Sequence, residues 1–172
     1  MLISHFYARL ISIAESDKLS EFELKLMDID SDHLGIPDTE YQSKISLPAG
    51  EFARICRDLG VIGDTVSIHA TKESVKFAVS GDLGAGSITC KQFASEKESE
   101  STTIQLNDEV ELKFALRYLN SFAKAAPLAD QVTLNMSLDV PLMVEFVIAG
   151  KGHVRFYLAP KINQDEDSAS AE

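Results

Sequence analysis

The 172-residue sequence has no tryptophan and only two cysteines, and it lacks an apolar run near the ~20 residues that a membrane-spanning helix needs. No cationic segment precedes an apolar one at the start, so we expect neither a secretory signal nor a membrane partner. Cys56 and Cys90 lie far apart without Cys-x-x-Cys spacing, which indicates reduced thiols inside the cell. The four histidines lack metal-ligand spacing, and no Ser/His/Asp arrangement indicates an enzyme.

Positive charge is also scarce, with 16 Lys and Arg against 27 Asp and Glu and a net charge of −11. The excess of acid is uneven along the chain. Residues 1–40 hold nine acidic and three basic residues, a charge of −6, and residues 163–172 contribute −4. Residues 41–162 are therefore nearly neutral at −1, and such a body does not exclude a nucleic-acid partner.

From residue 41 onward the hydrophobic pattern repeats one order of elements: a strand, a helix and further strands. In the first repeat we expect a strand at 45–47, a helix from Pro48 to about Leu59, and strands at 66–70, 75–79 and 87–91. In the second we expect a strand at 104–106, a helix near 109–124, and strands at 132–137, 142–148 and 153–158. This pattern predicts an α+β fold, a duplicated βαβββ unit with two helices on one face of a curved antiparallel sheet.

The predicted second helix contains KFALRYLNSFAK, residues 113–124, with three cations and no carboxylate. At 3.6 residues per turn, one face of this helix would hold Lys113, Arg117, Asn120, Ser121 and Lys124. A cationic face in an acidic protein indicates contact with an anionic partner, although such a face is more often simply solvated. On the first predicted helix, Arg54 and Arg57 share the solvent side, where Glu51 and Asp58 dilute their charge.

Five segments resemble the proliferating cell nuclear antigen (PCNA) family, the eukaryotic sliding clamps: KLMDIDSDHLGIPDTEY, EFARICRDLG, FALRYLN, DVPLMVEF and FYLAPKI. The resemblance runs in register from about Lys18 to Ile162, and LGIP and LAPKI are its most specific parts. It implies the DNA-clamp fold and four parts of the chain. Residues 1–27 would be a remnant of the clamp's N-terminal domain, 28–40 the interdomain connector, 41–162 the C-terminal domain, and 163–172 a disordered acidic tail. Residues 1–16 do not resemble the segment that the family has at this place, so we expect most of the N-terminal domain to be missing.

The resemblance also implies a function. Rings of this family encircle duplex DNA in the nucleus and act as processivity factors without catalytic activity or a cofactor. The implied partners are duplex DNA, DNA polymerase and other replication and repair proteins with a PIP-box peptide, the clamp loader, and further subunits in a homotrimer. An alternative from another class is a clamp-derived interaction module that binds client peptides, or competes with the full clamp, without encircling DNA.

Site residues follow from matching positions. The basic positions that face DNA in the family match Arg54, Arg57, Arg117 and Lys124, whereas Lys113 is added from the charge stripe alone. Phosphate contacts of this kind predict binding that is independent of base sequence and sensitive to salt. The partner-peptide pocket matches Leu34, Ile36, Ala115, Pro141, Tyr157, Ala159 and Pro160. Lys72 matches the lysine that accepts ubiquitin or SUMO in the family.

Ring closure in the family pairs one strand of each subunit with a strand of the next. The matching strands here are residues 17–25 and 83–91. Because the first has lost the sheet that supports it, its edge is expected to be exposed. We therefore expect this chain alone to be monomeric or poorly defined in assembly, which light scattering after size exclusion would test.

Overall fold

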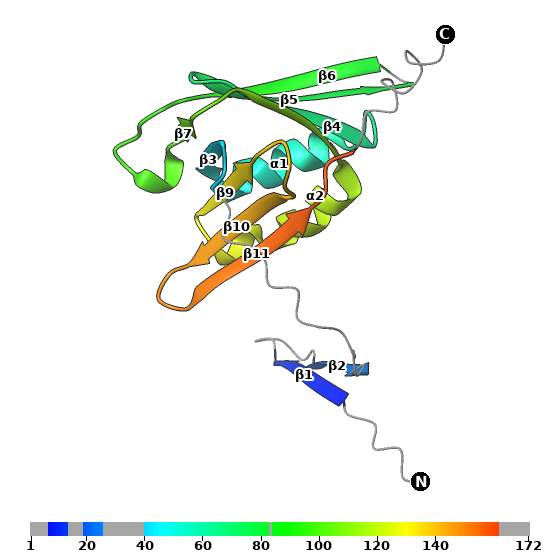
Figure 1. Cartoon of the computed structure of the whole chain (residues 1–172). Helices are drawn as coiled ribbons and strands as arrows, with labels where there is room; N and C mark the ends of the chain where they lie inside the picture. The colour runs from blue at the N-terminus through cyan, green and yellow to red at the C-terminus, as the bar shows by residue number, and fades with distance from the viewer. Residues whose placement is uncertain (1–6, 14–18, 26–39, 83, 162–172) are drawn as a thin grey trace. The chain divides into compact units, whose positions relative to one another are not determined.

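A computed structural model describes residues 7–13, 19–25, 40–82 and 84–161 of the chain (Figure 1). The chain forms two compact units, Met1–Thr39 and Glu40–Glu172, and each is described by itself. In the first unit, strand β1 (Tyr7–Ile13) pairs antiparallel with β2 (Leu19–Lys25) along its whole length. A strand at residues 17–25 was implied by the resemblance, and β2 confirms it over Leu19–Lys25. The pattern did not reveal β1, which pairs with one edge of β2.

The second unit contains the two predicted repeats and confirms the α+β class. The first repeat comprises β3 (Ser43–Pro48), α1 (Ala49–Leu59), β4 (Thr65–Ala70), β5 (Ser74–Gly81) and β6 (Gly84–Lys91). A short connection follows, made of η1 (Glu98–Glu100) and β7 (Thr103–Leu106). The second repeat comprises β8 (Val110–Ala115), α2 (Leu116–Phe122), the 3₁₀ segment η2 (Ala123–Leu128), β9 (Gln131–Met136), β10 (Leu142–Ile148) and β11 (Gly152–Leu158).

The strands of this unit form two antiparallel sheets, in the orders β11-β10-β9-β3-β7 and β6-β5-β4-β8. Figure 1 shows β4 to β6 grouped apart from β9 to β11. The two repeats exchange their first strands. β3 of the first repeat pairs with β9 of the second, with Ile45 opposite Leu134, and β8 of the second pairs with β4 of the first, with Ser67 opposite Lys113. Neither sheet is therefore built from one repeat alone.

The same reciprocity appears where each helix begins. Neither helix has a side-chain cap, because Pro48 and Ala115 stand at the N-cap positions. The first N–H groups of a helix lack intrahelical partners and need another acceptor. Here the N–H of Ala49 donates to the carbonyl of Asp130 at 2.9 Å, and the N–H of Leu116 donates to the carbonyl of Asp64 at 2.8 Å. Each helix start is thus held by the residue that precedes a strand of the other repeat.

The helix predicted near 109–124 is wrong in its first part, because residues 110–115 form β8 and α2 begins only at Leu116. Along VELKFA the burial alternates: Val110 and Phe114 are buried, whereas Glu111 and Lys113 are exposed. This period of two fits a strand that pairs with β4. The predicted first strand of the second repeat, 104–106, is real, but it is β7 at the edge of β3 rather than the strand that enters the helix.

One hydrophobic cluster joins both sheets and both helices. Its largest aromatic members are at most 1% exposed and come from α1, β5, β8 and β10: Phe52, Phe77, Phe114 and Phe146. Beside them, the ring of Phe156 on β11 stacks on Phe122 of α2, with centroids 4.6 Å apart. The core therefore holds the helices at fixed positions against both sheets.

Cys56 lies on the buried face of α1 and is 1% exposed. Burial raises the pKa of the Cys56 thiol to about 12. The pKa of Cys90, half-buried on β6, is also raised, first by burial and then by the carboxylate of Glu51. Because the thiolate is the reactive form, iodoacetamide at mildly alkaline pH should alkylate Cys90 slowly and Cys56 much more slowly still.

Concentrated guanidinium should make the two alkylation rates equal, as peptide mass spectrometry would show. Equal rates in native buffer would contradict the burial of Cys56.

The raised pKa of the Cys56 thiol also makes the stability of the fold depend on pH. The unfolded chain releases the Cys56 proton at lower pH than the folded chain, so this group's contribution to stability is complete below about pH 9 and falls as the pH rises toward 12.

Candidate nucleic-acid and peptide interfaces

The two helical segments lie next to each other and run antiparallel. Helix α1 begins beside Asp130, to whose carbonyl the N–H of Ala49 donates. It ends beside α2, since a Cβ atom at Gly60 would lie 3.0 Å from the amide nitrogen of Asn120. α1 contacts both α2 and η2 (Figure 1). Because both segments bury one face in the same core, their exposed sides form one surface, called here the helix surface.

On α1 the helix surface carries Arg54 and Arg57, whose side chains are 64% and 70% exposed. Each arginine has a carboxylate partner. Arg54 lies 3.4 Å from Glu51, and the Nε of Arg57 donates to Asp58 at 3.3 Å. Ion pairs this exposed contribute little to stability. Both guanidinium groups can therefore exchange a carboxylate for another anion, although the carboxylates lower the local positive potential.

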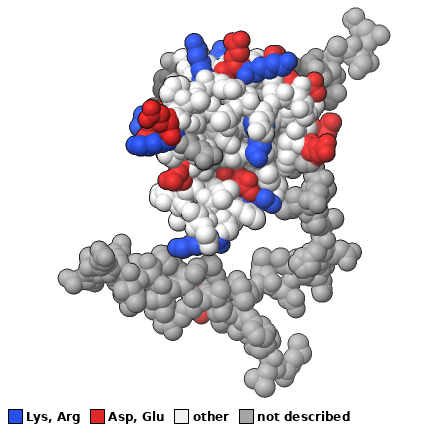
Figure 2. All heavy atoms as spheres, turned by 90° about the vertical axis from the view of Figure 1, so that its left-hand side faces the viewer, with Lys and Arg blue, Asp and Glu red and all other residues white. Residues whose placement is uncertain are grey.

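On α2 and η2 the helix surface carries Arg117 and Lys124, both exposed. Within the described residues neither forms an ion pair. The guanidinium of Arg117 donates to the hydroxyl of Tyr118 at 3.0 Å and lies 4.7 Å from the centroid of that ring, which holds it along the helix. On the face shown in Figure 2, Lys and Arg side chains (blue) are interspersed with Asp and Glu side chains (red).

Lys113 does not belong to the helix surface. Its side chain is exposed on β8, and its carbonyl accepts a hydrogen bond from the N–H of Lys161 at 2.8 Å. The predicted stripe that aligned Lys113 with Arg117 and Lys124 required a helix from about residue 109, and that helix does not exist. The argument for Lys113 as a DNA contact is therefore lost, because it had no other support.

The predicted peptide-pocket residues of the second unit gather around the end of β11. Leu142 pairs with Leu158, so Pro141 and Ala159 are neighbours just beyond this pair. The N–H of Lys161 donates to the carbonyl of Lys113 and so holds the chain after Pro160 against β8. Ala115 lies two residues after Lys113, on the same face of β8. Leu34 and Ile36 lie outside the described residues, as does nearly all of the predicted connector, 28–40.

Tyr157 and Lys72 complete the predicted set. Tyr157 is half-buried on β11. The pKa of Tyr41 is raised, first by burial and then by the nearby Tyr157, whereas Arg155 acts to lower it. Lys72 is exposed in the turn between β4 and β5. The N–H of Thr71 donates to the carbonyl of Ser74 at 2.9 Å and fixes that turn. A lysine held outward on a tight turn is accessible to a modifying enzyme.

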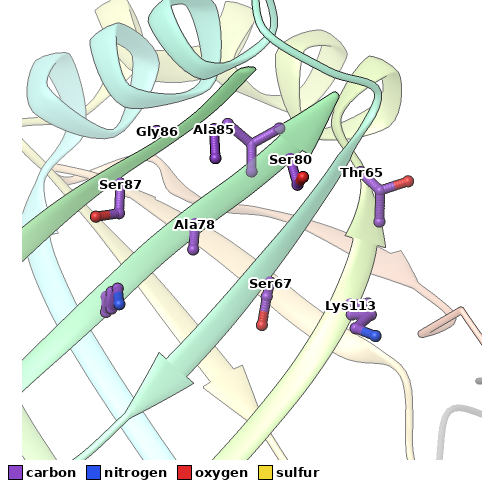
Figure 3. A pocket seen from close by; sticks show the side chains of 10 residues that line it. Thr65, Ser67, Ala78, Ser80, Ala85, Gly86, Ser87 and Lys113 are labelled. Carbon is purple, nitrogen blue, oxygen red and sulfur yellow. The ribbon is translucent and has the colours of Figure 1, made fainter. Parts of the chain in front are cut away.

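Sequence reasoning missed a groove on the outward face of the β6-β5-β4-β8 sheet (Figure 3). The groove has a volume of about 620 Å³ and is lined by Thr65, Ser67, Lys76, Ala78, Val79, Ser80, Ala85, Gly86, Ser87 and Lys113. Small outward residues on three neighbouring strands were its only signal. That signal is uninformative until the strand register is known, because the residues lie far apart in sequence.

The architecture defines a class. A duplicated βαβββ unit with exchanged first strands and two adjacent antiparallel helices is the α+β domain of the DNA clamps. Residues 35–161 match the family model described as "Proliferating cell nuclear antigen, C-terminal domain". Because this match spans most of the chain, the chain belongs to the PCNA family. The family consists of non-enzymatic sliding clamps that are typically nuclear. In the described part of the chain, no helix has the length and apolar character needed to cross a bilayer.

Proposed function

We propose that this chain acts in a sliding clamp, as a non-catalytic processivity factor that tethers DNA polymerase and other replication and repair proteins to duplex DNA in the nucleus. The helix surface carries the proposal. Two rigid antiparallel helices present Arg54, Arg57, Arg117 and Lys124 to solvent, and with these cations included residues 41–162 are almost neutral. Together with the family match, this arrangement fits the wall of a ring around DNA. The four-part division of the chain proposed from the sequence belongs to the same proposal.

DNA contact through this surface would use the phosphate backbone. Long cationic side chains on a helix reach phosphates without reading base edges, so the binding would not depend on sequence and the ring could slide. Arg117 and Lys124 would contribute most, because no carboxylate of the described residues pairs with them. Before they could contact phosphates, Arg54 and Arg57 would have to break their ion pairs with Glu51 and Asp58.

The other partners would bind elsewhere on the chain. Pro141, Tyr157, Ala159 and Pro160, with Ala115, would form part of an apolar pocket for the aromatic and aliphatic anchors of a PIP-box peptide, completed by Leu34 and Ile36. Lys72 would accept ubiquitin or SUMO, which its exposed turn favours. A clamp loader and further subunits, three per ring at full length, would complete the assembly.

The test replaces Arg117 and Lys124 with alanine and measures binding to a fluorescent DNA duplex over a range of salt concentrations, in a chain completed with a clamp N-terminal domain. If each side chain neutralises one phosphate, the slope of log K against log salt should become shallower by about 1.8. The fold should survive, because both residues are exposed. The matched control replaces two exposed lysines outside the helix surface, Lys44 and Lys151. An unchanged slope in the double variant would reject the helix surface as the DNA contact.

A second candidate is the interaction module that binds client peptides without encircling DNA. The observation in its favour is that two of the four helix cations already pair with carboxylates, which weakens the attraction for DNA. The two candidates differ in retention on circular DNA. A clamp loaded onto a circle stays until the circle is cut, whereas the interaction module binds a PIP-box peptide but leaves the circle at once.

A further inference from the structure

The groove of Figure 3 is organised around one row of residues across the four-stranded sheet. The strand register places Lys113 on β8 opposite Ser67 on β4, Ser67 opposite Ala78 on β5, and Ala78 opposite Ser87 on β6. Because Ser67, Ala78 and Ser87 all have small side chains, the sheet is hollowed there. Lys76, two residues before Ala78 on the same face of β5, lines the groove as well.

The groove and its margin carry more positive than negative charge. Lys76 and Lys113 line it, and Lys161 lies at its edge, where its Nζ donates to the hydroxyl of Thr65 at 2.5 Å. A smaller hollow of about 290 Å³ lies between Lys113 and Lys161. Among the residues that line the two hollows the carboxylate is Glu111, which accepts a hydrogen bond from Ser67 at 2.6 Å. Three ammonium groups against one carboxylate, with serine hydroxyls between them, suit a ligand that bears several carboxylates.

The acidic segment that follows Lys161 in the sequence is a ligand of this kind. The described residues end at Lys161, which two hydrogen bonds fasten to the margin of the groove. The next acidic residues, Asp165, Glu166 and Asp167, come four to six residues later. An extended chain covers roughly 13–20 Å over this length. Lys76 lies two strand spacings and two residues from Lys113, a span of about 12 Å. The acidic segment can therefore reach both lysines of the groove.

We propose that residues 163–172 dock in this groove, with their carboxylates paired to Lys76 and Lys113. Each exposed ion pair is weak, so docking would depend on the tether, which gives an effective concentration in roughly the millimolar range. Salt would oppose docking, because it screens exposed charges. Docking on the sheet would also keep the acidic segment away from Arg117 and Lys124 on the helix surface.

The test compares amide ¹H–¹⁵N spectra of the full chain with those of a variant that ends at Ile162. Removing the segment should shift the amide resonances of Ser67, Ala78 and Ser87. In a K76Q/K113Q background the same truncation should leave these resonances unmoved, whereas the charge-matched K44Q/K151Q background should behave like the original chain. The spectrum of each variant reports independently whether the fold is intact.

A second measurement uses a synthetic peptide of residues 162–172, added to the shortened chain. It should move the same three resonances, and severalfold less in molar salt or when Asp165, Glu166 and Asp167 are changed to their amides. Three results would overturn the proposal: truncation that changes only the neighbours of Lys161, shifts of equal size in the K76Q/K113Q background, or peptide-induced shifts on the helix surface instead. The last result would mean that the segment competes with DNA.

Discussion

Replacing Phe146 with alanine should lower the free energy of unfolding by about 3–5 kcal/mol. Phe146 is fully buried on β10, and its ring meets that of Phe156 edge-on at 6.2 Å. Phe156 in turn stacks on Phe122 of α2. The substitution leaves a cavity where the five-stranded sheet meets the helices and removes one aromatic contact. Against a typical total stability of about 5–15 kcal/mol, the loss is large. Urea titration followed by far-ultraviolet circular dichroism measures it, since the chain has no tryptophan to report by fluorescence.

The next residue on the same strand provides the matched control. Val147 is 59% exposed and points to the opposite face of the sheet, so Val147→Ala should change stability by less than about 0.5 kcal/mol. Both variants should keep the urea m-value, because neither changes how much surface unfolding exposes. Similar losses in the two variants would mean that the inward and outward faces of β10 are assigned incorrectly.

Replacing Gly81 with alanine should cost about 2–3 kcal/mol, the upper part of the range for overpacking. A Cβ atom at the end of β5 would overlap the carbonyl oxygen of Ile62 and lie 3.2 Å from the Cα of Gly63. Both obstacles are backbone atoms, which cannot rotate away as a side chain can. The connection between α1 and β4 would have to move, and the midpoint of a urea titration would record the cost.

The same substitution at Gly50 should have the opposite sign. Gly50 lies in α1, and apart from its chain neighbours and the adjoining helix backbone no atom is within 4 Å of the position that a Cβ would take. Alanine there lowers the entropy of the unfolded chain and favours the helix, which should stabilise the protein by up to about 1 kcal/mol. Destabilisation at both glycines would show that crowding at Ile62 is not the cause of the Gly81 effect.

The elements of the second unit were largely predictable, because hydrophobic periodicity is a local signal. The strands predicted at 132–137 and 142–148 and the helix ending near Leu59 match β9, β10 and α1 closely. The exception was VELKFA, where a strand runs directly into a helix. Lys113 and Arg117 are spaced for one helical turn, yet they lie on different elements.

Partners in the sheets were not predictable, because pairing depends on contacts between distant parts of the chain. Residues 45 and 134 face each other across β3 and β9, and nothing in either segment specifies the other. For the same reason the cations of the helices could be recognised in the sequence, whereas the groove could not. Arg54 and Arg117 each stand out within one helical segment. Ser67, Ala78 and Ser87 become neighbours only through the register of three strands.

The strand exchange has a consequence for the history of the fold. A solitary βαβββ repeat would have a first strand with no sheet to join and a helix whose first N–H lacks the carbonyl that the other repeat supplies. Two identical copies can satisfy both needs by pairing strand for strand about a two-fold axis. A separate peptide of one such repeat would thus be expected to fold only as a homodimer, and the second unit resembles two such copies joined in one chain.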